Sequence, residues 1–167
     1  VAKDAAEATN WYRKAAAKGD VIAMNGLGWK YQNGKGADKD SVEATKWYQK
    51  AADLGYADAM DNLGLMHANG NGVTKNDAEA AKWFRSAADR NHLGAMIRLG
   101  FMYSTGRGVK KDLAETLNWY KKSADKGSSD AMNRIGNIYS LGTGVEKDYA
   151  EAFKWYRKAA DSGSVFG

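Results

Sequence analysis

The 167-residue chain contains no cysteine, no proline and only two histidines. Without cysteine, disulfide bonds, thiolate nucleophiles and cysteine-ligated zinc are excluded, and cysteine usage gives no information on the redox compartment. Because the chain has no proline, no helix is expected to be kinked or broken by one. The chain also lacks a run of about 18 apolar residues, so no membrane-spanning helix is expected. Its first ten residues lack the apolar stretch of a signal peptide.

The composition is that of an ordinary folded protein, with 44% hydrophobic and 27% charged residues. Intrinsic disorder is therefore not expected. The net charge of +5 is compatible with an acidic partner. However, lysine and arginine are spread along the chain and form no block, so the charge alone is a weak indicator of function.

Tryptophan recurs along the chain at a constant step of 36 residues. Other residue types keep the same step, without insertion or deletion, which identifies an internal repeat. The repeating columns are Trp11, Trp47, Trp83, Trp119, Trp155; Glu7, Glu43, Glu79, Glu115, Glu151; Ala16, Ala52, Ala88, Ala124, Ala160; and Gly28, Gly64, Gly100, Gly136.

Each repeat contains two patterns of apolar residues at three- and four-residue spacing, which predict two helices, A and B. Helix B is expected to open on an Asx residue followed three positions later by Glu, the pattern of a capping box. These residues are Asp4, Asp40, Asn76, Asp112 and Asp148. Helix B is expected to close at a left-handed residue. The candidates are Gly19, Gly55, Asn91, Gly127 and Gly163. Helix A should end before the G-x-G turns that start at Gly34, Gly70, Gly106 and Gly142.

The predicted order is therefore a leading B helix followed by four A-B pairs. The expected B helices cover about 4–18, 40–54, 76–90, 112–126 and 148–162, and the A helices 21–32, 57–68, 93–104 and 129–140. The corresponding organisation is a half repeat at 1–19, full repeats at 20–55, 56–91, 92–127 and 128–163, and the start of a further repeat at 164–167. Because one pair cannot bury both of its faces, stability must come from stacking of neighbouring repeats.

The repeat reads A-M-x-x-L-G-x-x-Y-x-x-G-x-G-V-x-K-D-x-x-E-A-x-x-W-Y-x-K-A-A-D-x-G, which resembles the Sel-one-like repeat, a relative of the tetratricopeptide repeat. The resemblance covers essentially the whole chain, and the departures are small: Ala37 replaces Val, His67 replaces Tyr and Asn91 replaces Gly. It implies an all-α fold, a right-handed superhelix or solenoid. It also implies an adaptor or scaffold role, often in bacteria, with a partner on the concave face; periplasmic, secreted and cytoplasmic locations all remain open.

In related tetratricopeptide arrays helix A lines the concave face, which places a set of variable positions there. We expect the partner to contact Ile22, Asn25, Trp29, Asp58, Asp61, Leu65, Ile97, Phe101, Asn133 and Asn137. A further variable column on this face contains Gln32, Ala68, Ser104 and Ser140. One column, which begins with Trp29, carries large apolar side chains where solvent is expected, a feature of protein-binding grooves. The alternative is that Trp29, Leu65 and Phe101 pack against the neighbouring A helix.

The repeating aromatic columns of helix B are interpreted as structural, because a ligand cage does not need five identical copies. No catalytic, metal or cofactor site is expected. His67 and His92 are far apart in sequence and have no cysteine with them, whereas zinc needs three or four converging ligands. Asp58 and Asp61 with His67 form at most a polar cluster. The G-x-G turns follow helices rather than strands, and the motifs of nucleophilic and metal-dependent hydrolases are absent.

Basic residues form stripes on helix B, as nucleic-acid-binding proteins can. Their place in the last turns of the helix favours a local role instead, because cations stabilise helix C-termini. Glu43 with Lys46, and the equivalent pairs in two other repeats, should form i, i+3 ion pairs. We therefore expect no nucleic-acid partner.

The chain begins on a B helix, and Val165 and Phe166 near its end stand where a further A helix is expected to start. It therefore resembles a segment of a longer array, and uncapped ends predict end-to-end association. The sequence favours a non-enzymatic scaffold that binds a protein or peptide. A structural or self-associating solenoid and a binder of small molecules or cell-wall fragments remain the alternatives, and the latter requires a closed pocket with converging polar groups.

Overall fold

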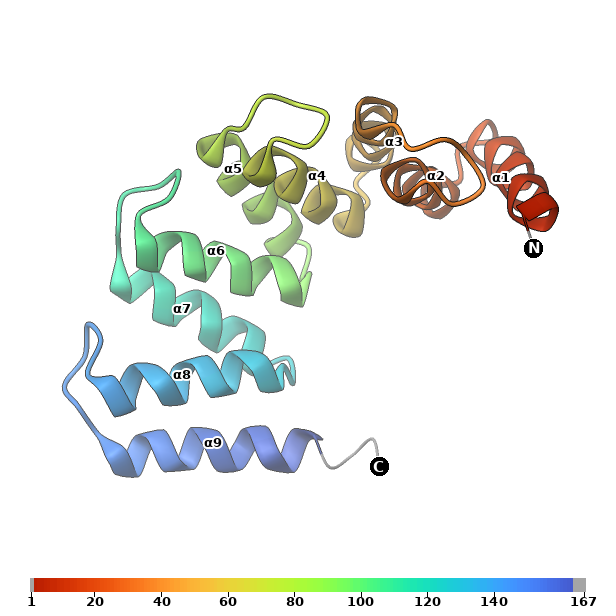
Figure 1. Cartoon of the computed structure of the whole chain (residues 1–167). Helices are drawn as coiled ribbons and strands as arrows, with labels where there is room; N and C mark the ends of the chain where they lie inside the picture. Colours follow the sequence, from red (N-terminus) through yellow and green to blue (C-terminus); the bar gives the residue numbers. More distant parts are fainter. Residues whose placement is uncertain (1, 164–167) are drawn as a thin grey trace. The chain divides into compact units, whose positions relative to one another are not determined.

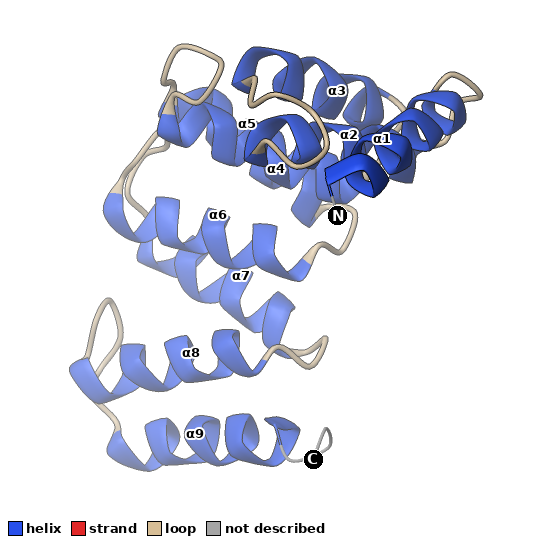
Figure 2. Ribbon diagram, turned by 45° about the vertical axis from the view of Figure 1, so that its right-hand side comes forward, coloured by secondary structure: helices blue, strands red, loops and turns tan. Residues whose placement is uncertain are grey.

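The computed structural model describes residues 2–163, and within them all regular structure is helical (Figures 1 and 2). The chain divides into two compact units, of which the first ends at Arg90 and the second begins at Asn91. The first unit contains α1 (Ala2–Ala16), α2 (Val21–Asn33), α3 (Ser41–Asp53), α4 (Ala57–Asn69) and α5 (Asp77–Ala88). The second contains α6 (Leu93–Thr105), α7 (Leu113–Ala124), α8 (Ser129–Leu141) and α9 (Tyr149–Gly163).

Inside each unit, every helix packs against the next one along the chain. In the second unit, α6, α7, α8 and α9 lie side by side in chain order (Figures 1 and 2). The predicted A helices are α2, α4, α6 and α8, and the predicted B helices are α1, α3, α5, α7 and α9. The all-α solenoid fold expected from the sequence is thus confirmed for the part of the chain that the structure describes.

The B helices start as the Asx pattern predicts, with one exception. Asp40 Oδ1 accepts the backbone N–H of Glu43 at 2.9 Å, and the corresponding bond recurs at the start of α5, α7 and α9. The Glu43 carboxylate receives Lys46 Nζ at 3.0 Å instead of closing a capping box. The prediction for Asp4 was wrong: α1 already begins at Ala2, so Asp4 lies in its first turn.

The left-handed residues after the helices also follow the prediction. Gly34, the residue directly after the end of α2, has φ of 67°. Asn91, the one substitution for glycine after a B helix, has φ of 67° and is the only described residue other than glycine with a positive φ. Asn tolerates this region better than other side chains because it can hydrogen-bond locally. At Gly163 the prediction was wrong, because this residue is the last of α9 and does not have a positive φ.

The repeating glycine and aromatic columns pack against each other. A Cβ atom on Gly28 would lie 2.5 Å from the ring of Tyr48, and one on Gly100 would lie 2.5 Å from the ring of Tyr120. The glycine therefore allows an aromatic side chain of helix B to lie directly on the backbone of helix A. In the second unit this contact is part of a core that contains Tyr120, Ala124, Ala131, Met132, Ile135, Trp155 and Ala159.

The tryptophan column is structural in most repeats. Trp119 and Trp155 are buried, and Trp47 and Trp83 are half-buried. Trp11 departs from the expectation of a packed side chain, because 62% of it is exposed. Trp155 packs against α8, the A helix before it, whereas among the described residues no A helix precedes α1.

Candidate protein-binding face

We define the A-face as the side of the four A helices that carries the predicted partner-binding positions. In the first unit it contains Ile22, Asn25 and Trp29 on α2, and Asp58, Asp61 and Leu65 on α4. In the second unit it contains Ile97 and Phe101 on α6, and Asn133 and Asn137 on α8. Each unit presents its own part of this face, and the two parts are described separately.

In the first unit, α2 exposes two large apolar side chains. Trp29 is 46% exposed, and Ile22, about two helical turns earlier on the same helix, is also exposed. The ammonium group of Lys35 lies 5.5 Å from the centroid of the Trp29 ring. Such a position allows a cation–π interaction. Trp29 is therefore available as an apolar anchor with a positive charge beside it.

A side-chain hydrogen bond joins the A helices α2 and α4 of the first unit. Asn62 Nδ2 of α4 donates a hydrogen bond to Asn25 Oδ1 of α2 at 2.9 Å, and both side chains are half-buried. Asp61, expected to face a partner, is only 5% exposed and is corrected to a buried position.

The remaining predicted positions of α4 differ in exposure. Asp58 is exposed, and its Oδ2 accepts the hydroxyl of Tyr56 at 2.9 Å. Burial raises the pKa of Tyr56, and the hydrogen bond to the Asp58 carboxylate raises it further. Leu65 is half-buried, which agrees with the alternative that this side chain packs within the array. The first unit thus offers Trp29 as its main exposed aromatic residue on the A-face.

In the second unit, Phe101 of α6 is 42% exposed, while Ile97 is half-buried against the core. Asn133 and Asn137 of α8 are exposed. Asn137 Oδ1 accepts the hydroxyl of Tyr156 at 2.6 Å, so its oxygen is already used within the unit. Its amide group retains two N–H donors for other contacts. Asn25 and Asn137, predicted to contact a partner, therefore also join neighbouring helices.

A cavity of about 210 Å³ lies beside this part of the A-face, between α6, α7 and α8. Its lining includes Ser104, Arg134 and the predicted residue Asn137. Sequence reasoning did not single out Arg134. The signal was nevertheless present, because its column reads Gly26, Asn62, Arg98 and Arg134 and so varies between repeats as the other A-face columns do.

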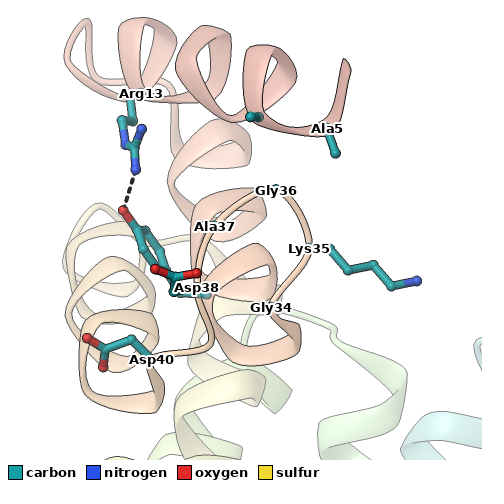
Figure 3. Close-up of a pocket in the computed structure, with 10 residues that line it drawn as sticks. Ala5, Arg13, Gly34, Lys35, Gly36, Ala37, Asp38 and Asp40 are labelled. Carbon is teal, nitrogen blue, oxygen red and sulfur yellow. Dashed lines mark hydrogen bonds between the residues drawn. The ribbon is translucent and has the colours of Figure 1, made fainter. Parts of the chain in front are cut away.

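A larger, open cavity of about 1020 Å³ lies between α1 and the loop that follows α2 (Figure 3). Arg13 Nη2 donates to the Tyr31 hydroxyl at 2.8 Å, as the dashed line in Figure 3 marks, and Asp40 is occupied as a helix cap. Lys35 extends away from the other labelled side chains (Figure 3). The polar groups that line this cavity are thus paired locally or point in different directions. They do not converge as the polar groups of a small-molecule site do.

The two histidines have separate environments. His92 Nδ1 accepts the backbone N–H of Ala95 at 3.0 Å and caps α6. His67 is half-buried in α4, in the column that otherwise contains tyrosine. Over residues 2–163, no group of three or more His, Asp or Glu side chains is placed to hold a metal ion. Within the same range, no helix is long and apolar enough to span a membrane.

The lysine stripe of helix B lies over the tryptophan column. Lys50 Nζ is 4.2 Å from the centroid of the Trp47 ring, and Lys122 Nζ is 4.1 Å from that of Trp119. The predicted i, i+3 ion pairs are also confirmed, for example Lys46 with Glu43 at 3.0 Å. The lysines therefore have local partners on their own helices.

A family model described as the Sel1 repeat matches the chain five times. The matched residues are 1–20, 21–56, 57–92, 94–128 and 129–164. Among proteins with curated descriptions, none matches the chain.

Several solved structures are similar to the chain, and those named here are bacterial. A Sel1 repeat protein from Oxalobacter formigenes is 42% identical with a TM-score of 0.89, and the match covers 96% of this chain and 65% of that one. A protective antigen with an SLR fold from uropathogenic Escherichia coli is 42% identical with a TM-score of 0.90, over 96% of this chain and 34% of that one. An immunity protein from Pseudomonas aeruginosa is 26% identical with a TM-score of 0.62, over 93% of this chain and 57% of that one. The chain thus spans less than two thirds of the length of each.

Proposed function

We propose that this chain, which belongs to the Sel1 repeat family, is a non-enzymatic scaffold that binds a segment of a partner protein on its A-face. Sel1 repeat proteins generally mediate protein–protein interactions and generally lack enzymatic activity. We place the partner on the A helices because two of their aromatic side chains, Trp29 and Phe101, are exposed.

The observation that carries the proposal is the exposure of Trp29 and Phe101, at 46% and 42%. These residues occupy one column of the repeat, and this column changes from repeat to repeat while the packing columns stay constant. By contrast, aromatic residues that recur every 36 residues on helix B, such as Tyr48 and Phe84, are buried. Exposed aromatic side chains within a polar surround are the usual anchors of protein interfaces.

The test is affinity capture from cells with three proteins: the unchanged chain, a Trp29→Ala, Phe101→Ala variant, and a Phe153→Ala control. Phe153 is also an exposed aromatic residue, but it lies on the B helix α9. We expect a partner that binds the unchanged chain and the control equally, and that binds the double variant at least about tenfold more weakly, because removing an interface anchor has effects of that size. Circular dichroism must show equal helical content in all three.

Two outcomes would move the binding site elsewhere. The first is a partner retained by the Trp29→Ala, Phe101→Ala variant. The second is an equal loss in the Phe153→Ala control, which would place the contact on α9 or would reflect adhesion to exposed aromatic groups in general.

Self-association is a second candidate property, and it is favoured by the exposure of α9. Tyr149 and Phe153 are each 67% exposed, whereas their equivalents one repeat earlier, Leu113 and Leu117, are half-buried. In α7 these positions are covered from the next repeat: a Cβ atom on Gly144, in the loop after α8, would lie 2.5 Å from the Leu113 side chain. A second copy of the chain is the proposed cover for this side of α9. Val165 and Phe166, on which the sequence-based expectation also rested, lie outside the described residues.

A further inference from the structure

The cavity of about 210 Å³ in the second unit is open to solvent and is lined by both apolar and polar side chains. Leu113, Ile138 and Leu141 supply apolar surface, and Tyr120 of α7 also lines it. Ser104 of α6 and Arg134 of α8 supply polar groups. Small-molecule sites usually have volumes of about 300–1,000 Å³. This cavity is below that range, so a single bulky side chain fits it better than a whole ligand does.

The counterpart of this position in the first unit is occupied by the protein itself. There, the Tyr48 hydroxyl donates to Gln32 Oε1 at 2.7 Å, and Asn62 donates to Asn25. In the second unit the equivalent of Gln32 is the shorter Ser104, whose hydroxyl turns back to the Phe101 carbonyl at 2.7 Å. The shorter side chain leaves open the space beside Tyr120 that a glutamine would enter.

Arg134 replaces Asn62 at this position, and Ile97 replaces Asn25, so the amide pair of the first unit cannot form. The Arg134 guanidinium carbon lies 5.9 Å from the centroid of the Tyr120 ring, which holds the group beside the cavity. Arg134 Nε donates to Asp130 Oδ1 at 3.1 Å, and 40% of the arginine side chain is exposed. Exposed ion pairs of this kind contribute little to stability, so a partner's carboxylate can share the guanidinium.

The charge of the second unit also fits an acidic ligand. From Asn91 to the end, the chain has twelve lysine and arginine residues against eight aspartate and glutamate residues, so this unit carries most of the net positive charge. A surplus of positive charge favours encounter with an acidic segment.

We propose that the cavity takes one bulky apolar side chain from an acidic segment of the partner protein, with a neighbouring carboxylate bound by Arg134. This inference rests on the proposed function, because it names the chemistry of the segment that the A-face binds. Phe101, one turn before Ser104 on α6, then adds a second apolar contact beside the cavity.

The test uses a small probe that combines the two features, N-acetyl-L-phenylalanine, and its uncharged carboxamide as the matched probe. Binding is followed by chemical-shift changes in ¹H–¹⁵N spectra of the full chain. We expect saturable changes at the backbone amides of Thr116, Ile138 and Thr143, with a dissociation constant on the order of a millimolar for a probe of this size. The acid should bind at least about threefold more tightly than the carboxamide.

Three variants separate the parts of the proposal. Ser104→Gln reproduces the first-unit arrangement and should abolish binding of both probes by filling the cavity. Arg134→Asn should remove the preference for the acid. Arg157→Asn is the control: Arg157 is also four residues from an aspartate, Asp161, at 4.0 Å, but it lies on α9 and does not line the cavity. It removes the same charge and should leave binding of both probes unchanged.

The proposal is overturned by shifts that do not involve the cavity, by no shifts at all, or by binding that survives Ser104→Gln. Equal affinity for acid and carboxamide, or an equal effect of Arg134→Asn and Arg157→Asn, overturns the assignment of Arg134. Spectra of each variant must retain the remaining peak positions. Because the probes need no natural partner, this result is independent of affinity capture: a partner lost with Trp29 and Phe101 but no probe binding leaves the A-face function standing without the cavity.

Discussion

At the scale of single residues, the clearest energetic signature is that of Tyr48. Its side chain is fully buried, and its hydroxyl donates to Gln32 Oε1 at 2.7 Å. Burial raises the pKa of Tyr48 well above its ordinary value of about 10. The folded state therefore holds the phenolic proton more tightly than the unfolded chain does. The stability that results is fully present below pH of about 10 and is lost as the pH rises above it.

We predict that replacing Tyr48 by Phe flattens the decline of the unfolding free energy between about pH 9.5 and 11, since the phenol that ionises only on unfolding is gone. Near neutral pH the variant should be less stable by about 1 kcal/mol, because Gln32 loses its hydrogen bond. Urea denaturation followed by circular dichroism measures both quantities. Tyr149→Phe, at an exposed position, is the control. If the unfolding free energy of Tyr48→Phe falls with pH as steeply as that of the unchanged chain, Tyr48 is not the source of the decline.

At the scale of secondary-structure elements, the N-caps of the B helices fix where each helix starts. For α7, Asp112 Oδ1 accepts the Glu115 N–H at 2.9 Å. Replacing Asp112 by Ala should lower the unfolding free energy by about 0.5–2 kcal/mol, the usual effect of losing a cap. Asp112→Asn should lose much less, because Asn76 already caps α5 through the same bond at 3.0 Å. Thermal or urea unfolding distinguishes them, and equal losses would assign the effect to charge rather than to the cap.

These elements were predictable because their signals are local. The Asx cap and the left-handed residue depend on neighbours in sequence, and the 36-residue step shows where they recur; Asp40, Gly34 and Asn91 have the predicted conformations. The prediction for Asp4 was wrong because a local pattern marks a possible cap but does not exclude helical residues before it. The ends of α1, α3, α5 and α7 were placed one or two residues too far, because a left-handed residue stands beyond a short closing turn, such as the one in which the Gly55 N–H donates to the Ala52 carbonyl.

The A-face was predictable only in part, because exposure depends on contacts between helices rather than on spacing. Trp29 and Phe101 are exposed, as a binding groove requires. Asp61 is buried, although it occupies the same column of the repeat as the half-buried Asn25 and the exposed Asn133. The cavity beside Arg134 was not foreseen, since it results from the difference in length between Gln32 and Ser104 and becomes visible only once Tyr120 is placed next to it. The use of these positions for binding stays a prediction.

At the scale of the whole molecule, α1 and α9 expose opposite sides of the contact between repeats. The exposed side of α1 corresponds to the one that a preceding A helix covers in later repeats, and the exposed side of α9 to the one that a following repeat covers in earlier ones. Trp11 of α1 is exposed and lines a cavity of about 470 Å³ with Lys14 and Lys18. The later tryptophans of this column are covered, as when Trp155 packs on α8. On α9, Tyr149 and Phe153 stand where the repeat pattern calls for cover from a following repeat. One copy's α9 can therefore meet another copy's α1, which is a heterologous, head-to-tail contact.

We predict that the sedimentation coefficient of the chain rises with concentration, because head-to-tail contacts leave further ends free to associate. Either Trp11→Glu or Phe153→Glu should abolish this rise, since a charge is costly to bury in an apolar contact. An equimolar mixture of the two variants should form dimers and nothing larger, because each retains one intact side. If only Phe153→Glu has an effect and the mixture stays monomeric, α9 pairs with itself instead. Constant sedimentation of the unchanged chain at all concentrations would remove self-association from its properties, whereas a Phe101→Glu control that also abolishes the rise would assign the contact to the A-face.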